Sequence, residues 1–243
     1  MLLAIDIGNT NIGAGVFEGT RLIKRLNIPT QKYTIQNLIN LLGKIAINDC
    51  IICSVVPEIS GIIKRDLKKL LGKKAFCLGE DIRAPMKNLY RRPRQVGQDR
   101  LVNAYGAAVM YGYPAIVVDS GTAITFDVIS KRKEYIGGII LPGLEISLDA
   151  LAKRTALLPK IKINRPREFI GRDTRNSMLS GIIYGFAALI DDLAERIKDK
   201  VSRKAIVIGT GGNVELITKY CKNIDKIDKD LTLKGLNLIY SNR

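Results

Sequence analysis

Two short polar runs, one in each half of the chain, contain the residue types that bind nucleotide phosphates. The first, Asp6–Asn11 (Asp-Ile-Gly-Asn-Thr-Asn), follows the apolar run Met1–Ile5. The second, Asp119–Ala123 (Asp-Ser-Gly-Thr-Ala), follows the apolar run Ala115–Val118. Each apolar run predicts a buried strand that ends on a carboxylate. Either polar run alone is also typical of an ordinary turn, but their repetition half a chain apart favours a duplicated fold that holds a nucleoside triphosphate between its halves.

The residue types in these runs have distinct chemical uses. Asp6 can hold a hydrated magnesium ion, because this metal prefers oxygen ligands. Gly8 lets a ligand approach the backbone, and Thr10 and Asn11 can donate hydrogen bonds to phosphate oxygens. In the second run, Thr122 could meet the phosphates from the other side.

The cysteines and the absence of histidine restrict other chemistry. Cys50 and Cys53 have the Cys-x-x-Cys spacing, but the surrounding apolar residues predict a strand, which would place the two thiols on opposite faces. We expect them, with Cys77 and Cys221, to be reduced thiols, mostly buried. A chain without histidine cannot use histidine for acid–base chemistry, and a transition-metal site is disfavoured.

The formal net charge of +16 raises nucleic acid as a partner. However, the cations are spread along the chain, aromatic residues make up only 6%, and there is no tryptophan to stack on bases. We therefore expect a solvated basic surface rather than a nucleic acid partner, and an anionic substrate fits the charge equally well.

The length and hydropathy of the chain indicate a globular protein. Its 243 residues, 47% of them hydrophobic, can form a full core in one large domain or two small ones. No run of eighteen apolar residues occurs, so no membrane span is expected. No signal peptide is evident, and we expect a cytoplasmic location.

The first half predicts the order strand, strand, strand, helix, strand, helix, strand. The strands are expected near residues 1–5, 12–17, 22–28, 50–56 and 75–78, and the helices at 34–46 and at 58–71, with Gly72 as the helix stop. A loop rich in arginine and proline follows at 81–94, and a helix is expected from about Asp99 to Tyr111.

The second half repeats the three-strand opening. Gly112-Tyr113-Pro114 interrupts the chain, so the expected halves are residues 1–113 and 114–243. Strands are expected at 115–119, 123–129, 135–141 and 205–208. Helices are expected at 144–151 and 176–201, near Asn213 and at 231–239, and the basic segment 155–173 is expected to be irregular.

Six motifs, in order along almost the whole chain, resemble those of type III pantothenate kinases. They are Asp6–Asn11, Gly97-Gln98-Asp99-Arg100, Asp119–Ala123, Gly137–Gly143, Thr174 and Gly209-Thr210-Gly211-Gly212. The resemblance implies an α/β fold of duplicated ribonuclease H-like halves, with mixed sheets flanked by helices, as in the actin/hexokinase/Hsp70-like ATPases. One departure is Arg92, which precedes Pro93 where the family usually has asparagine, and which affects the expected shape of that loop.

The resemblance implies ATP-dependent phosphorylation of the terminal hydroxyl of pantothenate to 4'-phosphopantothenate, the first step of coenzyme A biosynthesis. The implied pantothenate-binding residues are Tyr90, Gly97, Gln98, Asp99, Arg100 and Thr174. The implied ATP-binding residues are Asp6, Ile7, Gly8, Asn9, Thr10, Asn11, Ile12, Gly13, Thr122, Gly211 and Gly212. Asp6 would hold Mg²⁺ through water, and Asp119 would hold a monovalent cation, potassium or ammonium.

Each assignment in the acceptor site has a plainer alternative. Asp99 could be the base that receives the hydroxyl proton, or only a helix cap. Arg100 could clamp the pantothenate carboxylate with its planar fork, or only pair with Asp99. Tyr90 could be a loop aromatic that covers the core. Gly209–Gly212 could be only a turn from strand to helix.

The segment expected to form the longest helix also predicts a homodimer. Its residues 178–190 are apolar or small nearly all round, whereas a helix on a monomer's surface would show a polar stripe. We expect one face to form a two-fold interface. The resemblance implies that Thr174 contacts pantothenate held by the other protomer, although Thr174 could also be a helix cap.

Three other functions remain open at this stage. A different kinase or phosphatase of the same superfamily would share the phosphate-binding runs but not Gly97–Arg100. A non-enzymatic regulator, such as the transcription activators that some relatives resemble, could lose Asp6 or Asp99, and both are present here. A nucleic-acid-binding protein is suggested by charge alone, and would show steep salt dependence without ATP turnover.

Overall fold

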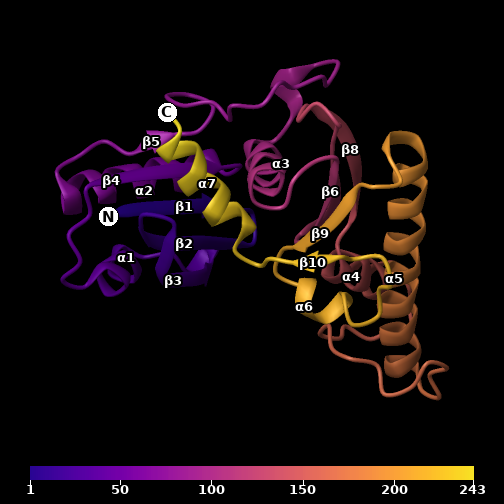
Figure 1. The fold of residues 1–243 in the computed structure, drawn as a ribbon. Coiled ribbons are helices and arrows are strands. Elements are labelled where there is room, and N and C mark those ends of the chain that lie inside the picture. The colour runs from indigo at the N-terminus through magenta and orange to yellow at the C-terminus, as the bar shows by residue number, and fades with distance from the viewer. The chain divides into compact units, whose positions relative to one another are not determined.

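The computed structural model describes all residues, Met1–Arg243, and divides into two compact units (Figure 1). Unit 1 contains Met1–Val109 together with Asp230–Arg243, and unit 2 contains Met110–Lys229. The chain therefore passes from one unit to the other twice. The expected division into residues 1–113 and 114–243 differs from this in two respects. The boundary lies after Val109, and the last segment of the chain, expected in the second half, belongs to unit 1.

Unit 1 is built on a five-stranded mixed sheet. Its strands are β1 (Leu2–Ile7), β2 (Asn11–Glu18), β3 (Arg21–Pro29), β4 (Asp49–Ser54) and β5 (Phe76–Cys77), in the order β3-β2-β1-β4-β5. The first three strands form an antiparallel meander, and β1 runs parallel to β4. Helices cover both faces, which explains why β1 is apolar at almost every position rather than at alternate ones.

The four helices of unit 1 pack against opposite faces of this sheet. They are α1 (Ile35–Leu42), α2 (Pro57–Leu71), α3 (Gln98–Met110) and α7 (Leu231–Ser241). One core joins Leu3 and Ile5 of β1 to α1 and α2, and the other joins Leu2 and Ala4 to α3 and α7. Because successive residues of a strand point to opposite faces, β1 supplies both cores.

Unit 2 repeats the same sheet topology. Its strands are β6 (Ala115–Ser120), β7 (Ala123–Ile129), β8 (Tyr135–Pro142), β9 (Ile206–Thr210) and β10 (Lys226–Ile227), in the order β10-β9-β6-β7-β8. Here β6, β7 and β8 form the antiparallel meander, and β6 runs parallel to β9. The two units are thus duplicated, as the paired sequence runs predict.

The helices of unit 2 are α4 (Leu144–Arg154), α5 (Thr174–Val201) and the single turn α6 (Val214–Ile217). By length and composition, α5 could cross a membrane. Its side chains Ile183 and Ile190 are instead fully buried in the core of unit 2 with Ile116 and Phe126 of the sheet. Helix α5 is therefore a core element of this unit.

The expected elements are present, with small differences at their ends. Gly72 has φ +66° and ends α2, as predicted. Helix α1 ends at Leu42 rather than near residue 46, because Gly43, with φ +55°, follows it. The thiols are free and mostly buried as expected, and Cys50 and Cys53 lie in the two different cores of unit 1. They are therefore on opposite faces of β4 and form neither a redox pair nor a metal knuckle.

Candidate active site

The Asp6 loop is pinned through its backbone and exposes its polar side chains. Asp6 is half-buried near the end of β1, and Asn9, Thr10 and Asn11 are exposed. The Gly8 N–H donates to the Asn11 carbonyl at 3.0 Å, which closes the turn. Thr30, which the sequence did not single out, donates from Oγ1 to the Gly8 carbonyl at 2.7 Å and from its N–H to the Thr10 carbonyl at 2.9 Å. These two bonds hold the loop through its backbone carbonyls.

In unit 1, Asp6 and Asp99 both lie near Cys53. In the β1–β4 register, Asp6 is paired with Cys53, which belongs to the same core as Val102 and Tyr105 of α3. Asp99 lies in the first turn of that helix. The pKa of the buried Cys53 thiol is raised first by burial and then by the charges of Asp6 and Asp99. Both carboxylates therefore lie near one buried thiol.

The environment of Asp99 suits a proton acceptor. Burial raises the pKa of its carboxyl group above the usual range, and the Arg100 N–H, which donates to Oδ1 at 2.9 Å, opposes that shift. A carboxylate whose basicity is raised by burial is a better proton acceptor than an exposed one. Helix α3 begins at Gln98, so Asp99 is inside its first turn rather than at the preceding cap position.

The other predicted acceptor residues of unit 1 lie in two adjoining segments. Arg100 is buried, with 8% of its surface exposed, and Gln98 is half-buried. Tyr90 is half-buried in the irregular segment before α3, where its N–H donates to Asn88 Oδ1 at 2.9 Å. The short 3₁₀ helix Pro93–Gln95 follows Arg92, the residue that departs from the family pattern.

In unit 2, the Asp119 loop and the glycine turn after β9 are in contact. Gly211 has φ +95°, and a Cβ atom there would collide with Asp119 Oδ1 and lie 2.7 Å from the Ser120 carbonyl carbon. The Asn213 N–H donates to the Ser120 carbonyl at 2.9 Å. The structure therefore joins two runs that are far apart in the sequence. Thr122 and Gly212 are exposed beside them.

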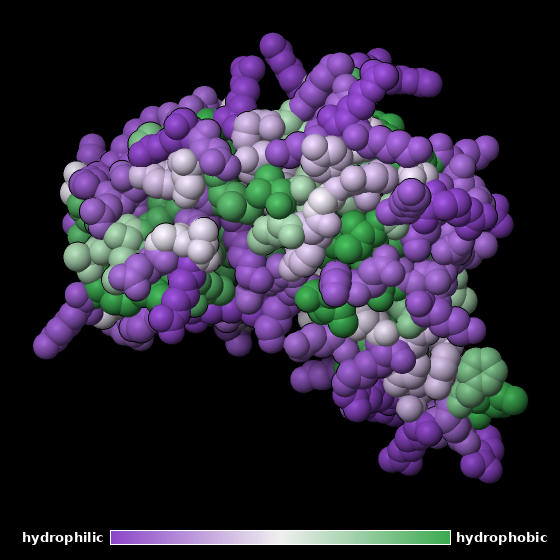
Figure 2. Space-filling view, in the orientation of Figure 1, coloured by the Kyte–Doolittle hydropathy of each residue, from purple (hydrophilic) through white to green (hydrophobic).

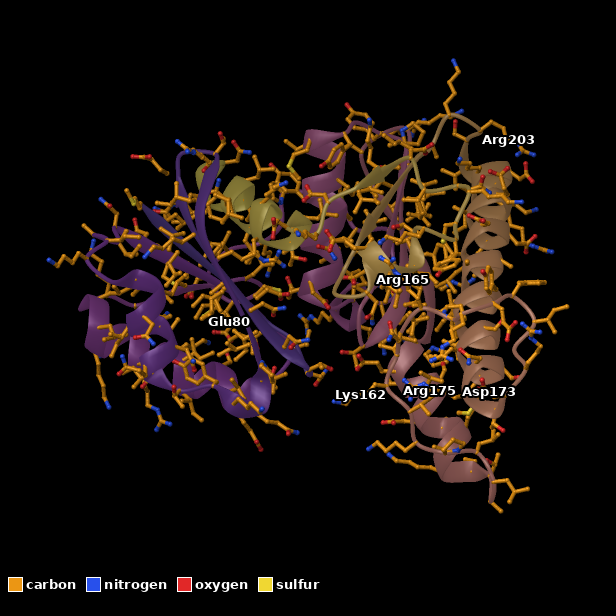
Figure 3. The ribbon with its side chains drawn as sticks, turned by 90° about the horizontal axis from the view of Figure 1, so that it is seen from below. Glu80, Lys162, Arg165, Asp173, Arg175 and Arg203 are labelled. Carbon is orange, nitrogen blue, oxygen red and sulfur yellow. The ribbon has the colours of Figure 1, made fainter.

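Thr174 is the first residue of α5 and is exposed, but it is not the helix cap. Asp173 has that role, because its Oδ1 accepts the Asn176 N–H at 2.8 Å. This hydrogen bond is the main reason that the pKa of Asp173 is lowered. Figure 3 shows Asp173 and Arg175 at one end of α5 and Arg203 at the other. The Thr174 hydroxyl is therefore not needed to cap the helix.

The donor atoms of both loops fit hard cations. Asp6 and Asp119 are half-buried carboxylates, each followed by a glycine within two residues. A Cβ atom on Gly121 would lie 3.2 Å from Asp119 Oδ1, so a side chain at this position would crowd the carboxylate. Carboxylate, carbonyl and hydroxyl oxygens with no sulfur or imidazole match magnesium and alkali ions, and not zinc or copper.

Comparison with solved structures defines the class of fold. A putative 2-dehydro-3-deoxygalactonokinase from Sinorhizobium meliloti is similar with a TM-score of 0.58 at 12% identity, over 100% of this chain and 99% of that one. A putative Baf family transcriptional activator from Campylobacter jejuni is similar with a TM-score of 0.60 at 21% identity, over 99% and 98%. The chain therefore shares with these proteins an α/β fold of two duplicated mixed sheets flanked by helices, as predicted.

Sequence comparison gives the family. A model of the type III pantothenate kinase family matches residues 2–196. A type III pantothenate kinase from Finegoldia magna is 43% identical over 252 residues, covering 98% of this chain and 96% of the relative. The chain belongs to the type III pantothenate kinase family, which confirms the resemblance seen in the six motifs.

Proposed function

We propose that this chain transfers a phosphoryl group from ATP to the terminal hydroxyl of pantothenate, forming 4'-phosphopantothenate in the first step of coenzyme A biosynthesis. The observation that carries this proposal is that Asp6 and Asp99 both lie near Cys53 in a chain of this family. A regulator that had lost catalysis would have no need to keep a buried carboxyl group of raised pKa at a substrate motif.

In unit 1, Asp99 acts on the acceptor. The terminal hydroxyl gives its proton to Asp99, its oxygen bonds to the γ-phosphorus of ATP, and the bond to the β,γ-bridging oxygen breaks to release ADP. Arg100 binds the pantothenate carboxylate, since a buried guanidinium presents several donors in a plane. Tyr90, Gly97 and Gln98 complete the acceptor contacts. Positioning and electrostatics supply most of the rate, because the transition state of phosphoryl transfer is loose.

The proposed ATP-binding residues of unit 1 are residues 6–13, from Asp6 to Gly13, and those of unit 2 are Thr122, Gly211 and Gly212. They would bind phosphate groups through backbone and hydroxyl donors. The glycine turn of Gly211 and Gly212 also gives adenosine flat access to the backbone. Asp6 would hold Mg²⁺ through water, and the ion would neutralise charge on the β- and γ-phosphates.

The activity is tested by assaying purified protein with ATP and magnesium against pantothenate, several sugars, glycerol and acetate. We expect ADP release with pantothenate and none above background with the others. Turnover with a sugar or acetate and none with pantothenate would make the chain a different kinase of the same fold. DNA binding without ATP turnover would instead support the nucleic-acid alternative. The proposed site of this activity is the cytoplasm.

Asp119 predicts a dependence on monovalent cations. A potassium or ammonium ion at this carboxylate would offset repulsion between Asp119 and the nucleotide phosphates. We expect the rate to rise when potassium replaces sodium at constant ionic strength, and to rise less in Asp119→Asn. Equal rates of the parent enzyme in the two salts would remove the cation site from the proposal.

We also propose that the enzyme is a homodimer. The face of α5 away from the core is made of small exposed residues, Gly181, Gly185 and Ala188, and a Cβ atom on either glycine would meet nothing within 4 Å. Small residues spaced in this way let two helices approach closely. The side chains of Leu157, Phe169 and Ile170 are 90%, 67% and 77% exposed in the segment before α5, where Figure 2 shows green side chains projecting among purple ones. A second copy could cover this surface.

A shared active site predicts complementation between two inactive variants. Thr174, free of a capping role, would reach pantothenate bound to Asp99 of the partner protomer. Asp99→Asn and Thr174→Arg should each be nearly inactive as homodimers. A mixed dimer has one site with both residues intact, so its activity should recover to about half of the parent value. No recovery after verified subunit exchange, or a monomer at assay concentration, would contradict the shared site.

A further inference from the structure

We infer that Gly79 is a positioning residue for the kinase reaction. At Gly79, the backbone of the turn Cys77–Ile82 contacts the Gln98 side chain, and this contact fixes the start of α3. The inference rests on the proposed function, in which Asp99 and Arg100, the next two residues of α3, act on pantothenate. Gly79 lies outside the six motifs, and the sequence placed it only at the end of a predicted strand.

The contact between Gly79 and Gln98 leaves no room for a methyl group. A Cβ atom on Gly79 would lie 2.9 Å from Cδ and 3.2 Å from both Cγ and Oε1 of Gln98. The side-chain amide of Gln98 therefore lies directly against the backbone of the turn. Because Gln98 is the first residue of α3, this contact fixes the helix where Asp99 and Arg100 begin.

The turn itself is held by its own backbone. The Gly79 N–H donates to the Ile82 carbonyl at 2.7 Å, and the Asp81 N–H donates to the Cys77 carbonyl at 2.9 Å. Asp81 Oδ2 accepts the Cys77 N–H, also at 2.9 Å. Gly79 has φ +87°, a conformation that side-chain-bearing residues rarely adopt. The turn Cys77–Ile82 is thus a closed loop rather than an adaptable segment.

Two lysines tie the same turn to its surroundings. Lys64 of α2 pairs with Glu80 at 3.1 Å, and Lys74 pairs with Asp81 at 2.9 Å. Figure 3 labels Glu80 in unit 1. The Cys77 thiol and these two carboxylates approach within 4.8 Å of one another, a grouping that could bind a metal ion. Both carboxylates already pair with lysines, so the ion pairs connect the turn to α2 and to the residues before β5.

An alanine at position 79 would therefore displace the Gln98 side chain and leave the fold intact. The colliding atoms are near the end of a flexible side chain, so Gln98 can rotate away at little cost to the core. Rotation removes the contact that fixes the first turn of α3, and a displacement of about 1 Å at a reacting group is enough to slow a reaction strongly. We therefore expect weaker binding of pantothenate, the acceptor held by the first turn of α3, and little change in the binding of ATP.

The test compares Gly79→Ala with Gly72→Ala. Gly72 also has a positive φ, +66°, but a Cβ atom there would meet nothing within 4 Å, so this control carries the backbone strain without the collision. Both variants should lose a few degrees of melting temperature. We expect Gly79→Ala alone to raise KM for pantothenate about tenfold, the size of one lost hydrogen bond, with KM for ATP within about twofold of the parent value.

A double variant shows whether the effect passes through Gln98. Gln98→Ala removes the side chain that would collide, so adding Gly79→Ala to it should change KM for pantothenate no further. Equal KM values in Gly79→Ala and Gly72→Ala, or fully additive effects in the double variant, would overturn the inference. If the parent enzyme uses another acceptor, the proposed function fails separately, and the same variants are compared with that acceptor.

Discussion

Asp99→Asn lowers kcat by roughly a hundredfold or more, the range for loss of an acid–base group. The amide keeps the size and most of the hydrogen bonding of the carboxylate but cannot accept the proton of the pantothenate hydroxyl. Because the transition state is loose, the fall can be smaller than for a base in acyl transfer. The measurement is steady-state kcat with pantothenate and ATP both saturating. Asp66→Asn is a control elsewhere in unit 1, where Asp66 accepts the Tyr33 hydroxyl at 3.0 Å.

The stability of Asp99→Asn separates catalysis from folding. Burial raises the pKa of Asp99, so the folded state binds the proton more tightly than the unfolded state does. Stability therefore falls as pH rises through the window between the two pKa values, and the ionised carboxylate costs folding free energy at neutral pH. Removing that charge should leave the melting temperature unchanged or higher. A folded variant with near-normal kcat would leave Asp99 with a structural role only.

Gly211→Ala is expected to abolish most ATP-dependent activity. The added Cβ atom would collide with Asp119 Oδ1 and lie 2.7 Å from the carbonyl carbon and 2.8 Å from the nitrogen of Ser120. Backbone atoms of β6 cannot rotate away as a side chain can, so the loop must shift. We expect kcat/KM for ATP to fall roughly a hundredfold, as for misplacement of about 1 Å, with a stability loss of about 3 kcal/mol from overpacking.

Gly112→Ala is the matched control for this variant. Its φ of +91° is close to that of Gly211, but a Cβ atom there would meet nothing within 4 Å. It should lose stability from backbone strain while keeping KM for ATP. If both variants lose ATP affinity equally, strain rather than the collision with Asp119 is responsible. If Gly211→Ala retains full activity, the contact between the two loops has no role in binding ATP.

Most of the fold follows from local sequence patterns. The apolar runs ended by carboxylates gave β1 and β6, and the repeated three-strand opening gave both meanders. The opposite placement of Cys50 and Cys53 followed from strand alternation alone. The assignment of α7 to unit 1 did not follow from local patterns, because it depends on packing between residues far apart in the chain, such as Gly235 of α7 against Val102 of α3.

The candidate site residues could be chosen from the sequence by residue type, but the residues that support them could not. Motif residues such as Asp6, Asp99 and Asp119 could be selected because their chemistry is evident in the sequence. The residues that support them could not be selected. Thr30 bonds the backbone of the Asp6 loop and Gly79 approaches Gln98 closely, and in both cases the partners are far apart in the sequence. For Thr174, the sequence left open a capping role that the structure gives to the preceding residue, Asp173.

The measurement that tests the central claim most directly is a proton-coupled ³¹P NMR spectrum of the product formed from ATP and pantothenate. Transfer to the terminal hydroxyl places the phosphate on a CH₂ carbon, so the account predicts a triplet that grows in step with ADP and is absent with Asp99→Asn. A doublet would place the phosphate on the secondary hydroxyl. A doublet, or ADP formed with inorganic phosphate alone, would contradict the assignment of this chain as a kinase of the terminal hydroxyl.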